Sequence, residues 1–188
     1  MKNLSDQEII DSVKKGNSSD YSIIVNRYKN KAFSMLKRML KNDFDAEEIL
    51  QDCFLKAYNS IGSFKGESKF SSWFYRIVYN SALTKLSSQK RKIESEMISV
   101  EDNFNLVSEY NSDDIDKKDL KEFIHEIINK LPERYSAIIT MFYLNEMSIE
   151  EISEVMQLSV SNVKVMLYRS RNALRDLILK SKLAKELI

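Results

Sequence analysis

The chain contains very little glycine, proline or cysteine: its 188 residues include 3 Gly, 1 Pro and 1 Cys. A single cysteine, Cys53, excludes an intramolecular disulfide and a cysteine-rich zinc site. The few glycines and the proline stand where a helix would begin, end or turn, as Gly16 and Pro132 do. This scarcity of helix-breaking residues predicts an all-α protein.

Long apolar runs are also missing, and the N-terminal MKNLSDQEII has the pattern of neither a signal peptide nor a membrane anchor. A cytoplasmic location is therefore expected. The sequence has no glycine-rich phosphate loop, and its one histidine, His125, lies in an amphipathic segment with no nucleophile beside it. We expect His125 at the surface, and we predict no enzymatic activity, no metal and no cofactor.

The net charge of +1 conceals two basic blocks that alternate with two acidic blocks. Residues 1–92 carry 17 Lys and Arg against 10 Asp and Glu, and residues 160–188 carry 7 against 2. The acidic blocks are residues 93–118, with 2 basic against 8 acidic side chains, and residues 119–159, with 3 against 8. Basic segments of this kind favour contact with nucleic acid.

Apolar residues at three- and four-residue spacing predict four helices in a first domain, residues 1–92. The expected helices cover residues 5–16, 21–39, 45–61 and 70–86. Ser5 with Glu8, and Asp45 with Glu48, have the spacing of capping boxes. Residues 93–118 show no sustained periodicity, so we interpret them as a flexible acidic linker.

The second domain, residues 119–188, is predicted to contain a helix-turn-helix. Helices are expected at 120–131, from Pro132 to about Leu144, at 149–156 and at 160–179, with a capping box from Ser148 to Glu151. The last helix would bury Val163 and Leu167 and leave an outward face suited to a major groove. That face consists of Ser161, Asn162, Lys164, Val165, Tyr168, Arg169 and Arg171. An ordinary helical hairpin with a solvated basic face is the alternative.

A second candidate surface lies on the helix at 70–86. If Trp73 and Phe74 face the core, the opposite stripe interleaves tyrosines with Arg and Asn, a composition that suits unpaired bases. The stripe contains Ser72, Tyr75, Arg76, Tyr79, Asn80 and Leu83. Aromatic residues at helical spacing also occur commonly in protein cores, which is the alternative here.

Three segments together resemble one known family, the extracytoplasmic-function (ECF) RNA polymerase sigma factors of the sigma-70 family. DAEEILQDCFLKAY (45–58) is similar to the family's polymerase-binding helix, and FKGESKFSSWFYRIVYN (64–80) to its promoter-melting, minus-ten-reading segment. LPERY (131–135) and the helix-turn-helix resemble the domain that reads the minus-thirty-five element. Gln157 departs from the pattern, because the turn of the motif commonly has Gly.

The resemblance implies a sigma factor whose partners are core RNA polymerase, promoter DNA and an anti-sigma factor. It places polymerase contacts on Asp45, Glu47, Glu48, Gln51 and Asp52. It places minus-ten DNA on the loop Gly66, Glu67, Ser68 and Lys69 and on Ser72, Tyr75, Arg76, Tyr79 and Asn80 of the stripe. It places minus-thirty-five DNA on the outward face of the last helix. The rival function is a helix-turn-helix regulator that acts without being a polymerase subunit.

Overall fold

The computed structural model describes residues 4–97 and 117–181, and these residues contain helices and no strand. The first four helices are α1 (Asp6–Lys14), α2 (Tyr21–Leu40), α3 (Asp43–Ser60) and α4 (Phe70–Met97). The remaining helices are α5 (Lys117–Asn129), α6 (Glu133–Ile139), α7 (Ile149–Met156) and α8 (Val160–Lys180). The predicted all-α class is therefore confirmed. Within the described residues, no helix is both long and apolar enough to cross a membrane.

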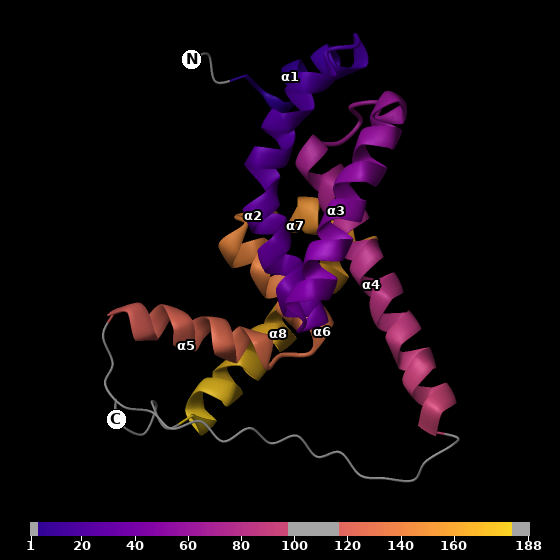
Figure 1. Ribbon diagram of the computed structural model, residues 1–188. Helices are drawn as coiled ribbons and strands as arrows, with labels where there is room; N and C mark the ends of the chain where they lie inside the picture. Colours follow the sequence, from indigo (N-terminus) through magenta and orange to yellow (C-terminus); the bar gives the residue numbers. More distant parts are fainter. Residues whose placement is uncertain (1–3, 98–116, 182–188) are drawn as a thin grey trace.

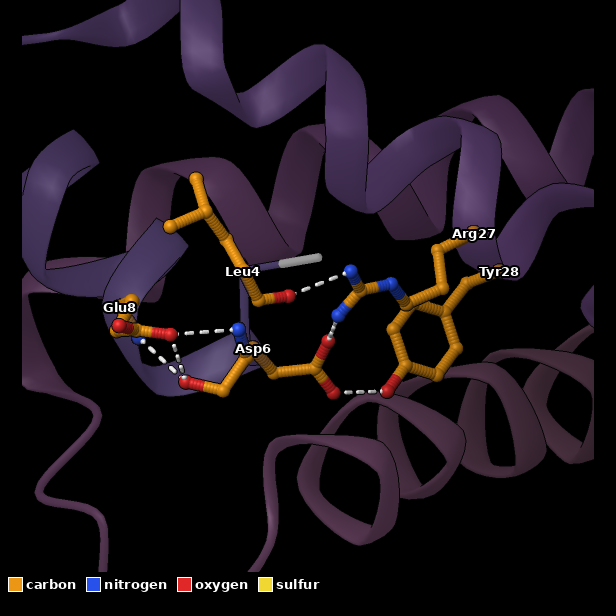
Figure 2. A network of polar contacts seen from close by, with 6 residues as sticks. Leu4, Asp6, Glu8, Arg27 and Tyr28 are labelled. Carbon is orange, nitrogen blue, oxygen red and sulfur yellow. Dashed lines mark hydrogen bonds and ion pairs between the residues drawn. The ribbon is translucent and has the colours of Figure 1, made fainter. Parts of the chain in front are cut away.

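Helix α1 is attached to α2 by a polar network around Asp6 (Figure 2). The carboxylate of Asp6 pairs with the guanidinium of Arg27 and accepts a hydrogen bond from the Tyr28 hydroxyl. Arg27 also donates to the backbone oxygen of Leu4 at 2.8 Å. Ser5 and Glu8 form the predicted capping box, in which Glu8 accepts from the Ser5 backbone nitrogen at 2.7 Å. The opening helix is thus fixed at its first turn.

The core of the first domain is aromatic and centres on α4. Phe74 is fully buried and stacks on Phe54 of α3 with ring centroids 4.8 Å apart. The ring of Tyr28 from α2 lies 5.6 Å from Phe74, and Cys53 is buried nearby on α3. Burial raises the pKa of the Cys53 thiol, as expected of an inert core cysteine.

The second domain begins with α5 and α6 and contains the predicted helix-turn-helix, α7 and α8. Helix α6 continues into one turn of π-helix, Thr140–Leu144. Ser148 and Glu151 form the predicted capping box of α7, and the Ser159 hydroxyl accepts from the backbone of Asn162 to start α8. Gln157 ends α7 in the left-handed conformation, with φ of 55°. A glycine would adopt this conformation without steric cost, which explains why the motif commonly has one there.

The two domains pack directly on each other. Helix α7 lies against α4, and both α5 and α6 lie against α2. In Figure 1 the orange helix α7 therefore sits among the indigo and magenta helices of the first domain. Arg38 of α2 is buried and contacts the His125 ring of α5, so His125 is half-buried at the domain contact and not a freely exposed surface residue. The buried residues of both domains form one continuous cluster.

Two expected boundaries differ from the structure. The N-cap of α3 is Asn42, whose side chain accepts from the Asp45 backbone at 3.2 Å, so Asp45 and Glu48 do not form the predicted capping box. Helix α4 continues to Met97, well past residue 86, and its far end extends away from the bundle (Figure 1). Residues 87–91 of this continuation are all polar, so apolar periodicity gives no signal there. The rest of the expected acidic linker, residues 98–116, lies outside the described residues.

The central role of Phe74 predicts a large loss of stability in Phe74→Ala. Removing a fully buried ring leaves a cavity and should lower the free energy of unfolding by about 3–5 kcal/mol. Phe44→Ala is the matched control, because Phe44 is 86% exposed and its loss should change stability by no more than about 0.5 kcal/mol. Urea unfolding followed by circular dichroism measures both. Equal destabilisation in the two variants would contradict this description of the core.

Candidate nucleic-acid interface

Part of the tyrosine stripe of α4 lies under the second domain, whereas Arg76 and Asn80 of the same stripe are exposed. Tyr75 is 2% exposed and Tyr79 is 3% exposed, and Ser72 beside them is also buried. We expected these side chains to face solvent, and the structure corrects that expectation, because α7 covers this side of α4. Phe74 is buried as predicted, whereas Trp73 is half-buried and packs on Phe64 with ring centroids 5.2 Å apart.

Two hydroxyl groups in this covered stripe have no hydrogen-bond partner among the described residues: Ser72 Oγ and Tyr75 Oη. Leaving such a group buried and unpaired costs about 1–3 kcal/mol. Burial also raises the pKa values of Tyr75 and Tyr79, although Arg134 of the second domain acts in the opposite direction on Tyr79. The covered face therefore contains polar side chains, and two of their hydroxyl groups form no hydrogen bond with the described residues.

The loop before α4 forms a shallow pocket of about 280 Å³ beside this stripe. Phe64, Gly66, Ser68, Trp73 and Arg76 are among the residues that line it. Gly66 has a φ of +75°, a conformation that side chains rarely adopt, so a glycine suits this bend. The pocket has aromatic and cationic walls, which are the groups that hold a single unpaired base.

Charged groups connect this region to α7. Lys69 Nζ lies 2.8 Å from Glu151 Oε1, and this contact raises the pKa of Lys69. Burial alone would raise the pKa of Glu151, but Lys69 and the Ser148 cap together hold it below its usual value. The side-chain amide of Gln157 faces the guanidinium of Arg76, and its oxygen accepts from Arg76 Nε at 3.1 Å in the orientation that pairs the two groups.

The predicted polymerase-binding residues on α3 divide into two groups. Lys85 of α4 forms 2.8 Å ion pairs with both Asp45 and Glu48, which raise the pKa of Lys85. These two carboxylates are therefore engaged within the first domain. The other three, Glu47, Gln51 and Asp52, are all exposed.

Sequence reasoning missed an apolar element of the same surface. Leu55 is 61% exposed on α3, and Phe44 is exposed at the start of the helix. The sequence did contain a signal for this apolar surface. Leu55 is a large apolar residue that lies outside the periodic stripe to which the buried Phe54 and Ala57 belong. An exposed apolar residue among polar neighbours is typical of a binding surface.

The outward face of α8 is exposed along its whole predicted length. Val163, Leu167 and Ser170 are buried and fix the orientation of the helix. All seven residues of the predicted face are exposed: Ser161, Asn162, Lys164, Val165, Tyr168, Arg169 and Arg171. Arg171 also donates from Nε to the Tyr143 hydroxyl at 2.7 Å and lies over the rings of Phe142 and Tyr143. The α8 face is thus accessible, while the tyrosines of the α4 stripe are covered.

The sequence matches two sigma-70 family models in this order: region 2 over residues 24–92 and region 4 over residues 122–174. It is 33% identical over 182 residues to the ECF RNA polymerase sigma-E factor of Haemophilus influenzae, covering 93% of this chain and 96% of that protein. The chain belongs to the ECF RNA polymerase sigma factors. It is also 34% identical over 174 residues to the sigma factor SigW of Bacillus subtilis, covering 88% of this chain and 92% of that one.

Solved structures agree on the fold of this sigma factor. The sigma factor RpoE from Bartonella quintana, in complex with the anti-sigma factor NepR, superposes with a TM-score of 0.67 at 17% identity. The likeness covers 87% of this chain and 99% of that one. In the part of the sigma factor that the structure describes, no group of three or more His, Cys, Asp or Glu side chains is arranged to hold a metal ion.

The covered stripe predicts that tyrosines of this sigma factor differ in reactivity toward tetranitromethane, which attacks the phenolate. Tyr75 is buried and its pKa is raised, so its nitration should be at least about tenfold slower than that of the exposed Tyr168. Peptide mass spectrometry after a short reaction measures both sites in one sample. Comparable rates at Tyr75 and Tyr168 would contradict the buried position of Tyr75.

Proposed function

We propose that this sigma factor binds core RNA polymerase and directs it to promoters by reading minus-ten and minus-thirty-five elements. The observation that carries this proposal is the presence of both sigma-70 regions in one chain, in order, over residues 24–92 and 122–174. The first domain, residues 1–92, binds polymerase and opened DNA, and the second, residues 119–188, binds duplex DNA. Residues 93–118 link the two.

The polymerase-binding surface is the outer face of α3. Glu47, Gln51 and Asp52 provide exposed polar groups, and Leu55 adds an exposed apolar side chain. Such a mixture of an apolar anchor and a polar surround is common at protein interfaces. Asp45 and Glu48 belong to the same proposed surface, where their ion pairs with Lys85 fix α3 against α4.

Minus-ten DNA binds to α4 and the loop before it. The loop residues Gly66, Glu67 and Ser68 line the pocket of about 280 Å³, which holds one extruded base. Lys69, the next residue of the loop, contacts the same strand. The α4 residues Ser72, Tyr75, Arg76, Tyr79 and Asn80 contact the separated strand. Base stacking on an aromatic ring contributes about 1–3 kcal/mol, and it is available only to unpaired bases, so binding itself favours strand separation.

Minus-thirty-five DNA binds to α8, which enters the major groove. Ser161, Asn162 and Lys164 near its N-terminus contact base edges, and Val165 contacts a thymine methyl group. Tyr168, Arg169 and Arg171 lie further along and bind phosphates. Arg171 is positioned for this by the Tyr143 hydroxyl.

The protein acts as a specificity subunit and has no catalytic role of its own. Because its target is polymerase on DNA, it works in the cytoplasm. An anti-sigma factor is a further partner by resemblance to the family. The alternative, a helix-turn-helix regulator that is not a polymerase subunit, would leave the region 2 match without a function.

Charge reversal on α3 should weaken the polymerase complex and leave folding intact. Asp52→Lys changes an exposed carboxylate on the proposed interface. Glu126→Lys is the matched control, because Glu126 is also an exposed carboxylate and lies on α5, outside the proposed surface. We expect at least about a tenfold lower affinity for core polymerase in Asp52→Lys alone, measured by fluorescence anisotropy. The same affinity in both variants would count against the α3 surface.

Substitutions along α8 should separate sequence choice from general DNA affinity. Asn162→Ala and Lys164→Ala should alter preference among minus-thirty-five sequences by about 1–3 kcal/mol. Arg169→Ala should instead weaken all sequences equally and reduce the salt dependence by about one unit. The measurement is in vitro transcription by holoenzyme from a randomised minus-thirty-five library at two salt concentrations. An unchanged preference in both Asn162→Ala and Lys164→Ala would refute this docking.

A further inference from the structure

Arg38 of α2 is a buried cation at the contact between α2 and α5. It is 4% exposed, and among the residues that the structure describes no carboxylate pairs with it. Arg27 and Lys85, by contrast, both pair with carboxylates of the first domain. A guanidinium keeps its charge at any ordinary pH, and burying a charge is costly unless it is paired. The described residues therefore leave Arg38 without a counter-ion.

The hydrogen bonds of the Arg38 guanidinium all go to neutral groups. Nη1 donates to the backbone oxygen of Ser34 at 2.9 Å and to the Ser34 hydroxyl. Nη2 contacts Nδ1 of His125, and because a guanidinium can only donate, this ring nitrogen must accept. The remaining Nε–H has no acceptor in the described part of the chain. Burial accordingly lowers the pKa of Arg38, and no neighbouring anion offsets this effect.

A pocket of about 320 Å³ lies beside this cation, and we call it the Arg38 pocket. Asn129 of α5 also lines it, and the side-chain oxygen Oδ1 of Asn129 is buried without a donor from any described residue. Phe33 provides an apolar wall. Lys37 lines the pocket too, but its charge is met by Asp43 at 2.7 Å. The Arg38 pocket thus combines an uncompensated cation, an acceptor without a donor and an aromatic ring.

These three features together select one class of ligand. A water molecule could satisfy both unpartnered atoms, but it would leave the charge of Arg38 uncompensated, and the pocket is far larger than the about 30 Å³ that one water occupies. A carboxylate would supply the charge, yet it has no proton to donate to Asn129. A singly protonated phosphate has both groups, because its anionic oxygens accept from a guanidinium and its O–H donates. Phosphate esters lose this last proton with a pKa of about 6, so the protonated form is accessible near neutral pH.

We propose that the Arg38 pocket binds a small phosphate monoester, with its phosphate on Arg38 and Asn129 and its organic group against Phe33. The proposal is independent of the proposed function, because none of these residues belongs to the surfaces assigned to polymerase or DNA. Arg38 and Phe33 lie on α2 and Asn129 lies on α5, so the ligand contacts both domains. Binding to the folded chain alone would also stabilise it by mass action.

The single histidine of the chain makes the pocket directly observable, because the ring-proton NMR signals of His125 need no assignment. Phenyl phosphate, titrated into the full-length protein at constant pH and ionic strength, should shift these signals in a saturable way. Phenyl sulfate has the same ring and a similar shape but carries no proton near neutral pH, so it should bind at least about fivefold more weakly. Absence of a saturable shift with phenyl phosphate would overturn the proposal. Equal affinity for the two compounds would overturn the selection of phosphate.

A matched pair of arginine variants tests whether Arg38 supplies the charge. Arg38→Met keeps an apolar stem of similar length and removes the guanidinium. Arg91→Met is the control, because Arg91 is exposed on α4 and bonds to Ser87 of the same helix. The affinity for phenyl phosphate should fall at least about tenfold in Arg38→Met and stay unchanged in Arg91→Met. Equal affinity in both variants would overturn the assignment of the site to Arg38.

Asn129→Leu provides a second test that keeps Arg38 in place, and thermal unfolding without ligand verifies that each variant is folded. Leucine has a similar shape but no acceptor, so this variant should bind phenyl phosphate and phenyl sulfate with equal affinity. A preference for phosphate that survives in Asn129→Leu would overturn the role of Asn129. Inorganic phosphate should bind the wild-type protein at least about threefold more weakly than phenyl phosphate, because it has no ring to pack on Phe33. Equal binding of these two would overturn the monoester assignment.

Discussion

The packing of α4 on two sides at once is the constraint on which the rest of this structure depends. Phe74 packs α4 into the core of the first domain, and Tyr75, the next residue along, lines a pocket together with Met147 and Glu151 of the second domain. The ring of Tyr28 on α2 touches both, with centroids 5.6 and 6.2 Å away. One aromatic cluster thus contributes to the core of the first domain and to the interface between the domains. A displacement of the second domain would therefore change contacts made by side chains next to that core.

This packing brings oppositely charged blocks of the chain next to each other. Taken separately, a basic first domain and an acidic start to the second domain indicate different partners. Folded together, they complement each other, and the basic end of the chain that forms α8 lies on an exposed face. The near-neutral sum of +1 is therefore a property of a chain whose blocks neutralise one another.

Local features were predictable from the sequence because their causes are local. The capping boxes at Ser5 and Ser148 and the inward face of α8 all follow from spacing over a few residues. The burial of Tyr79 was not predictable from the sequence. Helical periodicity shows which residues share a face of a helix, but it does not identify what packs against that face. The same holds for Asp45, whose partner Lys85 lies 40 residues away. The exposed α8 face is consistent with the sequence interpretation, and the roles of its residues remain proposals.

One carboxylate connects the start of a helix to the contact between the two domains. Glu151 uses Oε2 to accept from the Ser148 backbone at 2.7 Å and Oε1 to pair with Lys69 at 2.8 Å. Aspartate is one methylene shorter and is not expected to reach both groups, whereas glutamine would keep the cap but lose the attraction to Lys69. The first turn of α7 and the contact between the domains therefore share a single group. Substitutions at this position other than glutamine therefore alter both the contact between the domains and the start of the helix-turn-helix.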